Sequence, residues 1–187
     1  MKVVGIAGTN GSGKDTVGRV LSEKHGYLWV SVSDILRDEC RRRGLPVERE
    51  SLRAISAEWR RVGGLGVLVD KAVEALSRSK REYKGLAVGS LRNPGEIDRI
   101  HELHGLAVWV DAAPRVRYER IQRANRGRGS EDDITFEQFL SEEAAEMSHS
   151  GDEATLNMSA VKAACDKTLN NENGEAELEQ AIEELLA

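Results

Sequence analysis

The chain alternates between short runs of apolar, often β-branched residues and longer segments in which apolar residues recur every three or four positions. The short runs are typical of strands that are buried on both faces, and the longer segments are typical of amphipathic helices. The runs that predict strands are residues 2–7, 27–32, 85–90, 105–111 and 168–170.

The amphipathic segments fall between these strands. They predict helices at residues 13–25, 33–43, 47–62, 65–78, 94–104, 114–125, 136–147 and 175–186. Two polar stretches, 127–133 and 151–158, predict loops. Because strands and helices alternate, the sequence predicts an α/β fold with a mostly parallel sheet, whose ligands would bind beyond the carboxyl ends of the strands.

Length and composition narrow the class of protein. A chain of 187 residues is expected to form one domain. No apolar run approaches the roughly 20 residues of a membrane-spanning helix, and the first residues lack the apolar core of a signal peptide. Cys40 and Cys165 are too few for a disulfide framework or a zinc cluster. We therefore expect a cytoplasmic protein without a membrane partner.

The net charge of −5 conceals two oppositely charged parts. Residues 1–128 contain 25 Lys and Arg against 16 Asp and Glu, whereas residues 129–187 contain 2 against 16. The basic part is rich in arginine, with 19 Arg against 8 Lys in the whole chain. Because the planar guanidinium binds phosphate in a bidentate manner, the composition suggests a phosphate-binding region followed by an acidic segment.

A phosphate-binding loop is predicted at residues 8–14. Their sequence, GTNGSGK, has the Walker A spacing and lies between the first predicted strand and the first helix. Its glycines let successive N–H groups face an anion, which the helix dipole also favours. The residues expected to contact ATP here are Asn10, Gly11, Ser12, Gly13, Lys14, Asp15 and Thr16.

Asp15 departs from the Walker A pattern, in which Ser or Thr follows the lysine. A carboxylate is a good ligand for Mg²⁺, so Asp15 is the candidate metal residue, through water rather than directly. The alternative is an acid at the start of a helix, with the metal held by phosphates and water alone.

The GKD-T form of this loop resembles that of P-loop nucleotide kinases, the group that includes adenylate-kinase-like enzymes, deoxynucleoside monophosphate kinases and dephospho-CoA kinases. The resemblance implies a three-layer α/β/α fold with a five-stranded parallel sheet, in one domain that spans residues 1–187. It also implies three functional regions. These are a core of residues 1–32, 84–114 and 160–187, a helical acceptor-binding region at 33–80, and a lid at about 115–135.

Three segments resemble the acceptor site of these kinases. Residues 33–37 (SDILR) follow the second strand, so that Arg37 would bind the acceptor's phosphate and Asp34 would lie near the transfer site. Arg60 resembles the end of the acceptor-binding helix, although a solvated helix face is as good an interpretation. Arg92 follows the third strand, where Gly89-Ser90 replaces the family's Asp-Gly pair. It would contact phosphate, with a salt bridge to Glu96 as the alternative.

Two further segments resemble a lid and an adenine-binding loop. Arginines recur at every third residue from Arg117 to Arg126, and Arg128 follows. By resemblance Arg120 and Arg126 would act on the transferring phosphoryl group, and Arg117 would bind ATP. Asn171 lies in a segment similar to the family's adenine loop, where the alternative is a local turn.

The resemblance implies a kinase that uses ATP and Mg²⁺ to phosphorylate a nucleoside or deoxynucleoside monophosphate. A dephospho-CoA kinase is the first alternative, and a P-loop NTPase or RNA-binding regulator without transfer activity is the second. Nucleic acid is a poor partner because only 4% of residues are aromatic, too few for base-stacking platforms. The expected partner is therefore a small phosphate acceptor, bound by a monomer or a homodimer.

Overall fold

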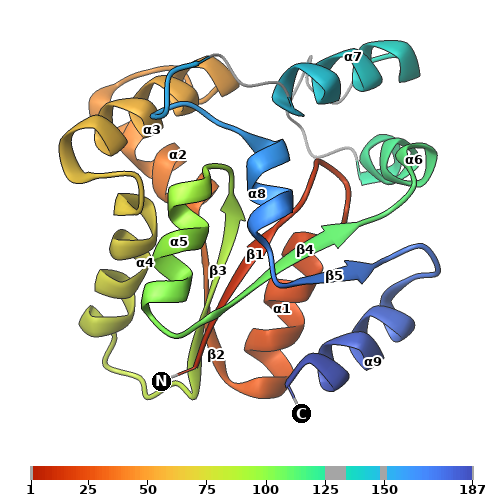
Figure 1. Cartoon of the computed structure of the whole chain (residues 1–187), viewed down its shortest axis with the longest axis horizontal. Coiled ribbons are helices and arrows are strands. Elements are labelled where there is room, and N and C mark those ends of the chain that lie inside the picture. Colours follow the sequence, from red (N-terminus) through yellow and green to blue (C-terminus); the bar gives the residue numbers. More distant parts are fainter. Residues whose placement is uncertain (1, 125–133, 148–150, 187) are drawn as a thin grey trace.

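The computed structural model describes residues 2–124, 134–147 and 151–186. Its centre is a sheet of five parallel strands in the order β2-β3-β1-β4-β5 (Figure 1). The strands are β1 (Lys2–Ala7), β2 (Tyr27–Ser31), β3 (Gly85–Leu91), β4 (Leu106–Asp111) and β5 (Lys167–Asn170). The predicted five-stranded parallel sheet is confirmed.

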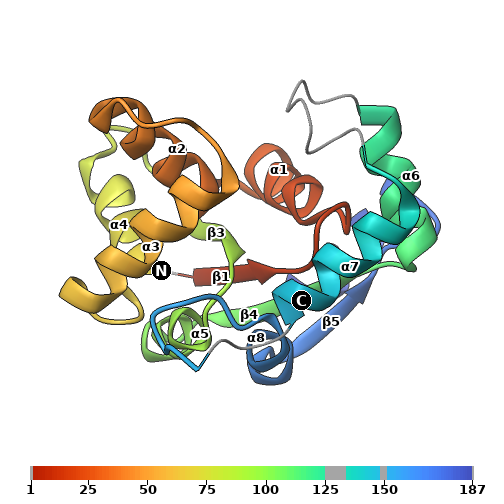
Figure 2. The ribbon, with the colours of Figure 1, turned by 90° about the horizontal axis from the view of Figure 1, so that it is seen from above.

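Helices cover both faces of the sheet. They are α1 (Lys14–His25), α2 (Val32–Arg43), α3 (Arg49–Gly63), α4 (Val67–Arg78), α5 (Pro94–Glu102), α6 (Pro114–Ala124), α7 (Phe136–Met147), α8 (Met158–Ala164) and α9 (Glu175–Leu186). Figure 2 shows α1 on one side of the sheet and α5 and α8 on the other. The predicted three-layer α/β/α arrangement is therefore confirmed.

Alternate residues of the strands supply two separate cores. Val4 and Ile6 of β1 pack in the core that includes α1 and α9. Val3 and Ala7 pack in the other core, with residues of α2, α3, α4, α5 and α8. Because neighbouring residues of a strand point to opposite faces, the apolar run in β1 fills both layers at once.

Helix α8 is absent from the prediction, which placed Met158 at the end of a loop and left residues 159–164 without an assigned element. It has seven residues and buries only Met158 and Val161, too few turns to produce a clear periodic pattern. The side chain of Asn157 caps it by accepting a hydrogen bond from the backbone N–H of Ala160.

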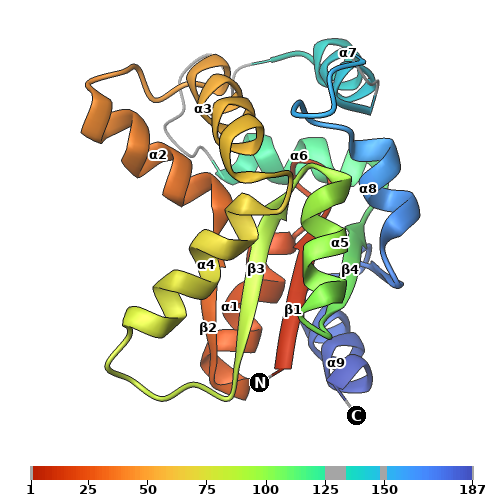
Figure 3. The same ribbon diagram turned by 60° about the vertical axis from the view of Figure 1, so that its left-hand side comes forward.

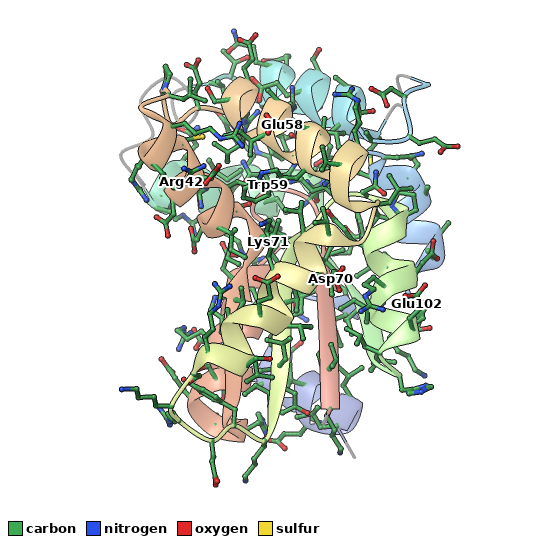
Figure 4. The ribbon with its side chains drawn as sticks, turned by 90° about the vertical axis from the view of Figure 1, so that its left-hand side faces the viewer. Arg42, Glu58, Trp59, Asp70, Lys71 and Glu102 are labelled. Carbon is green, nitrogen blue, oxygen red and sulfur yellow. The ribbon has the colours of Figure 1, made fainter. Side chains whose placement is uncertain are left out.

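The helical region over β2 and β3 is held partly by contacts between side chains on neighbouring helices. The ammonium group of Lys71 on α4 lies 4.0 Å from the ring centroid of Trp59 on α3. Figure 4 shows this pair, with Asp70 on the same helix facing α5. There the carboxylate of Asp70 accepts a hydrogen bond of 2.8 Å from Arg99, which also binds Glu102. These contacts connect α3, α4 and α5 into one layer.

Trp29 of β2 is a wedge between the sheet and α1, the helix that follows the predicted phosphate loop. A Cβ atom built at Gly18 of α1 would lie 2.2 Å from the Trp29 ring, and one at Gly89 of β3 would lie 1.9 Å from it. Both positions therefore need glycine because the indole fills the space of a side chain. The contact fixes how closely α1 approaches the sheet.

We predict that Gly89→Ala lowers the free energy of unfolding by about 1–3 kcal/mol, the usual cost of overpacking a core. Urea unfolding measures it. In a Trp29→Leu background the added methyl group has room, so the same substitution should cost much less. If Gly89→Ala lowered the free energy of unfolding equally in both backgrounds, the Trp29 ring would not be what excludes a side chain at position 89.

Candidate functional site

The phosphate loop joins the carboxyl end of β1 to the start of α1, and its backbone needs glycine at Gly8, Gly11 and Gly13. Gly11 has φ of 78°, and a Cβ atom there would lie 2.5 Å from the backbone oxygen of Arg117. Gly13 has φ of 98°, and its Cβ would lie 2.1 Å from the side-chain nitrogen of Asn171. The left-handed φ values and the close neighbours both exclude larger residues at these positions. Residues around the loop therefore hold its backbone in one conformation.

Asn171 is the residue that braces this loop. Its side-chain amide donates a 2.8 Å hydrogen bond to the backbone oxygen of Ser12, and its backbone N–H donates to the oxygen of Asp111. The side chain is buried. The resemblance predicts Asn171 beside adenine, whereas the structure places its amide against the loop backbone, just after β5.

The interior of the loop contains polar groups suited to an anion. The ammonium of Lys14 lies 3.5 Å from the backbone oxygen of Thr9 and is largely buried. The hydroxyl groups of Thr9 and Ser12 are also buried, and neither has a hydrogen-bond partner among the described residues. Since a buried hydroxyl without a partner is costly, a phosphate in the loop would satisfy donors that the protein leaves unused. The residues present therefore fit ATP.

Asp15 stands at the first turn of α1 and is exposed to solvent. In the part of the chain that the structure describes, no three or more His, Cys, Asp or Glu side chains are grouped to hold a metal. A Mg²⁺ ion at this site would thus depend on Asp15, phosphate oxygens and water, which is a usual arrangement for this ion.

The end of β3 carries local strain. Ser90 is buried and has φ of 64°, a conformation that favours glycine, and the register between β1 and β3 shifts beside it. Ser90 stands where the resembling kinases have the glycine of their Asp-Gly pair. The serine therefore adopts a backbone conformation that glycine reaches at no steric cost.

Arg92 follows this strained residue and points toward α7. Its guanidinium donates a 2.9 Å hydrogen bond to Glu146, and its backbone N–H donates to Glu96 at 2.7 Å. The alternative of a side-chain salt bridge between Arg92 and Glu96 is therefore wrong. The side chain is about 30% exposed, so it remains accessible to a ligand.

The structure gives Arg60 a different role from the predicted one. Predicted to bind the acceptor or to lie on a solvated helix face, it is instead buried, and its guanidinium donates to Glu96 at 2.7 Å and to the backbone oxygen of Ala154 at 2.9 Å. Glu96 is fully buried. Two opposite charges out of water are stable only with such complete pairing, so Arg60 is part of the structural framework.

Arg117, expected to bind ATP, is also buried. Its guanidinium donates to the carboxylate of Glu143 at 2.8 Å and to the backbone oxygen of Ala112 at 2.7 Å, and it lies 5.4 Å from the ring of Phe139. These contacts attach α6 to α7. What touches the loop is the backbone of Arg117, beside Gly11, and not its guanidinium.

The other predicted phosphate contacts have different surroundings. Arg37 lies on α2 and donates a 2.6 Å hydrogen bond to Asp34, which is exposed. One nitrogen of Arg120 is buried without a partner among the residues described. Arg126 and the loop predicted at 127–133 lie outside the described residues.

The carboxylates of α7 are a feature that sequence reasoning missed. Glu142 pairs with Arg49, Glu143 with Arg117, and Glu146 with Arg53 and Arg92. Burial raises the pKa of Glu146, but the positive charges of Arg92, Arg49 and Arg53 outweigh it and hold that pKa below its usual value. The sequence contains a pattern that could have indicated this cluster, because the acids are spaced three and four residues apart on a predicted helix and so share one face.

These carboxylates lie next to the phosphate loop. One pocket is lined by Asn10 of the loop, by Arg49 of α3, and by four residues of α7, which are Phe139, Glu142, Glu143 and Glu146. Figure 3 shows α3 and α7 together beyond the carboxyl ends of the strands, the side where parallel sheets bind ligands. The arrangement brings the loop and a set of arginines to one edge of the molecule.

Comparison with known proteins agrees with this geometry. The AAA domain family matches residues 4–146. The chain belongs to the AAA domain family. A UPF0200 protein of Pyrobaculum aerophilum is 30% identical to this AAA domain over 149 residues, which cover 79% of this chain and 78% of the relative.

Solved kinases share the fold of this AAA domain protein. Shikimate kinase from Bacteroides thetaiotaomicron aligns with a TM-score of 0.60 at 14% identity, covering 98% of this chain and 97% of the kinase. A gluconokinase from Sinorhizobium meliloti aligns at 0.51 and 16% identity, covering 99% and 95%. These likenesses show the fold, which is the one that the resemblance to P-loop nucleotide kinases implied. Within the described ranges, this AAA domain protein has no helix long and apolar enough to cross a membrane.

The buried pair predicts a difference between two adjacent arginines. Arg60→Ala should lower the free energy of unfolding by about 3–5 kcal/mol because Glu96 is left buried without its partner. Arg61 is the matched control: it is exposed and pairs with Asp152 at the surface, so Arg61→Ala should cost less than about 1 kcal/mol. Denaturant unfolding of both variants would contradict this assignment if the two losses were equal.

Proposed function

We propose that this protein is an ATP-dependent kinase that transfers the γ-phosphoryl group to a nucleoside or deoxynucleoside monophosphate. The observation that carries the proposal is the braced loop, with buried Lys14 and with the hydroxyls of Thr9 and Ser12, which lack a hydrogen-bond partner among the described residues. The family match and the kinase folds support the kinase class. The nucleotide acceptor is proposed from the resemblance and from the arginines at the same edge.

In this proposal the loop positions ATP and neutralises its charge. Successive backbone N–H groups and the start of α1 would bind the phosphates, and Lys14 would reach the β- and γ-phosphates. Mg²⁺, when bound near Asp15, would supply further neutralisation of the phosphate charge. A phosphate acceptor needs no general base at neutral pH, so the catalytic work of the side chains is positioning and charge stabilisation.

The acceptor would enter between the helical region at 33–80 and the end of β3. Arg92 is the residue proposed to touch both the acceptor and the transferred group, and Arg37 and Asp34 would orient the acceptor from α2. Arg120 and Arg126 are proposed to act from a lid at about 115–135 when it closes and excludes water. The core of residues 1–32, 84–114 and 160–187 would hold ATP.

Dephospho-CoA kinase is retained as the alternative activity because of the segment that contains Asn171. This residue follows β5 in a segment resembling that family, and it braces the phosphate loop directly. The solved neighbours add further acceptors to the test, since their names refer to shikimate and gluconate. For either activity we propose a cytoplasmic protein, to which the two free cysteines are suited.

The test is a coupled ADP-release assay with ATP and Mg²⁺, against nucleoside and deoxynucleoside monophosphates, dephospho-CoA, shikimate and gluconate. We predict release above the blank without acceptor for at least one monophosphate. Lys14→Ala should lower turnover by about 10²–10³-fold, as expected when a preorganised charge contact is lost from the transition state.

The control is Arg41→Ala, which removes an exposed arginine that pairs with Asp38 one turn earlier on the same helix. It should leave turnover nearly unchanged. Release equal to the blank with every acceptor, or near-normal turnover in Lys14→Ala, would contradict the proposed function.

A further inference from the structure

Glu146 of α7 is a buried carboxylate surrounded by arginines from two other elements. It accepts hydrogen bonds from Arg92 after β3 at 2.9 Å and from Arg53 on α3 at 3.2 Å. Arg49, one turn before Arg53 on α3, adds its charge from nearby. The carboxylate of Glu146 is thus held between helix α3 and the end of β3, next to the phosphate loop.

The cluster is unequal in exposure. The side chain of Glu146 is only 10% exposed, whereas that of Arg53 is 52% exposed and that of Arg92 is 30% exposed. Both arginines are therefore open to solvent on one side, while the carboxylate is the group they enclose. Glu146 also lines the pocket that contains Asn10 of the phosphate loop and Arg49. Two guanidinium groups suit a phosphate at least as well as a carboxylate, because phosphate carries more charge and more acceptor oxygens.

The fold depends less on the pairing of Glu146 with Arg53 and Arg92 than on the buried pair of Arg60 and Glu96. Helix α7 is attached by other contacts: Phe139 packs on Tyr118 of α6 with ring centroids 5.8 Å apart, and the hydroxyl of Ser159 donates to the backbone oxygen of Met147. Glu146 could leave the arginines while both ends of α7 remain attached.

We propose that Glu146 is an internal substitute for the acceptor's phosphate, which binds Arg53 and Arg92 by displacing this carboxylate. The inference rests on the proposed function for the identity of the acceptor as a phosphate compound. Without acceptor, the two arginines are neutralised by α7 and do not assist transfer of the γ-phosphoryl group to water. With acceptor, they are released onto its phosphate.

The experiment titrates the full chain with inorganic phosphate by calorimetry in the presence of saturating Mg²⁺ and ADP, so that the phosphate loop is filled. Ionic strength is matched with sodium chloride, which separates binding from screening. Glu146→Gln should bind phosphate about tenfold more tightly than wild type, because a competing internal anion is lost.

Two variants locate the effect. Glu137→Gln removes the same charge from an exposed residue of the same helix and should bind phosphate like wild type. In Glu146→Gln/Arg53→Gln the tighter binding should disappear, because one of the two arginines is gone. Equal affinity of Glu146→Gln and Glu137→Gln would overturn the proposal.

A second measurement decides the matter if Glu146→Gln does not fold. In the wild type, phosphate should increase amide hydrogen exchange near the end of α7, because Glu146 loses its contacts with Arg53 and Arg92, and sodium chloride should not. Unchanged exchange at phosphate saturation would overturn the proposal. Neither readout involves transfer, so a failed transfer assay beside a positive phosphate result would count against the proposed function alone.

Discussion

One buried carboxylate organises the acceptor side of this protein. Glu96 accepts hydrogen bonds from the guanidinium of Arg60 and from the backbone N–H groups of Arg92 and Asn93. Asn93 in turn caps α5 and binds the backbone oxygens of two residues in segment 152–157. A single charge therefore connects α3, the end of β3, α5 and the segment that follows α7. Because an unpaired buried carboxylate is so costly, these parts are held together in one arrangement.

The arginines of this region fall into two groups that differ in burial and in what they contact. Arg60 and Arg117 are buried in pairs that hold helices together. Arg49, Arg53 and Arg92 are partly exposed around the carboxylates of α7, beside the phosphate loop. Only pairs of the second kind can exchange a protein carboxylate for a ligand anion, because the water-accessible side of each guanidinium is already open. The same residue type therefore forms buried pairs between helices and partly exposed pairs beside the loop.

Sequence predicts the sheet, the layers and the loop well because each depends on local pattern. The apolar runs marked every strand, and the loop at residues 8–14 carries its own geometry in its glycines. The roles of the arginines could not be predicted in this way. Arg60 and Arg61 are neighbours with the same charge, but Arg60 lies on the buried face of α3 and pairs with Glu96, 36 residues away, whereas Arg61 is exposed. The short helix α8 was not predicted for another reason, because its two buried residues produce no periodic pattern in the sequence.

Residues 10–14 are proposed to bind the phosphates of ATP in the shape described. A crystal structure of the protein with Mg²⁺ and a non-hydrolysable ATP analogue tests it most directly. We predict the β- and γ-phosphates inside the loop, with the Lys14 ammonium and the Ser12 hydroxyl within hydrogen-bonding distance and Asn171 still bound to the loop backbone. An analogue bound elsewhere, or a loop that remains empty at saturating analogue, would contradict the account.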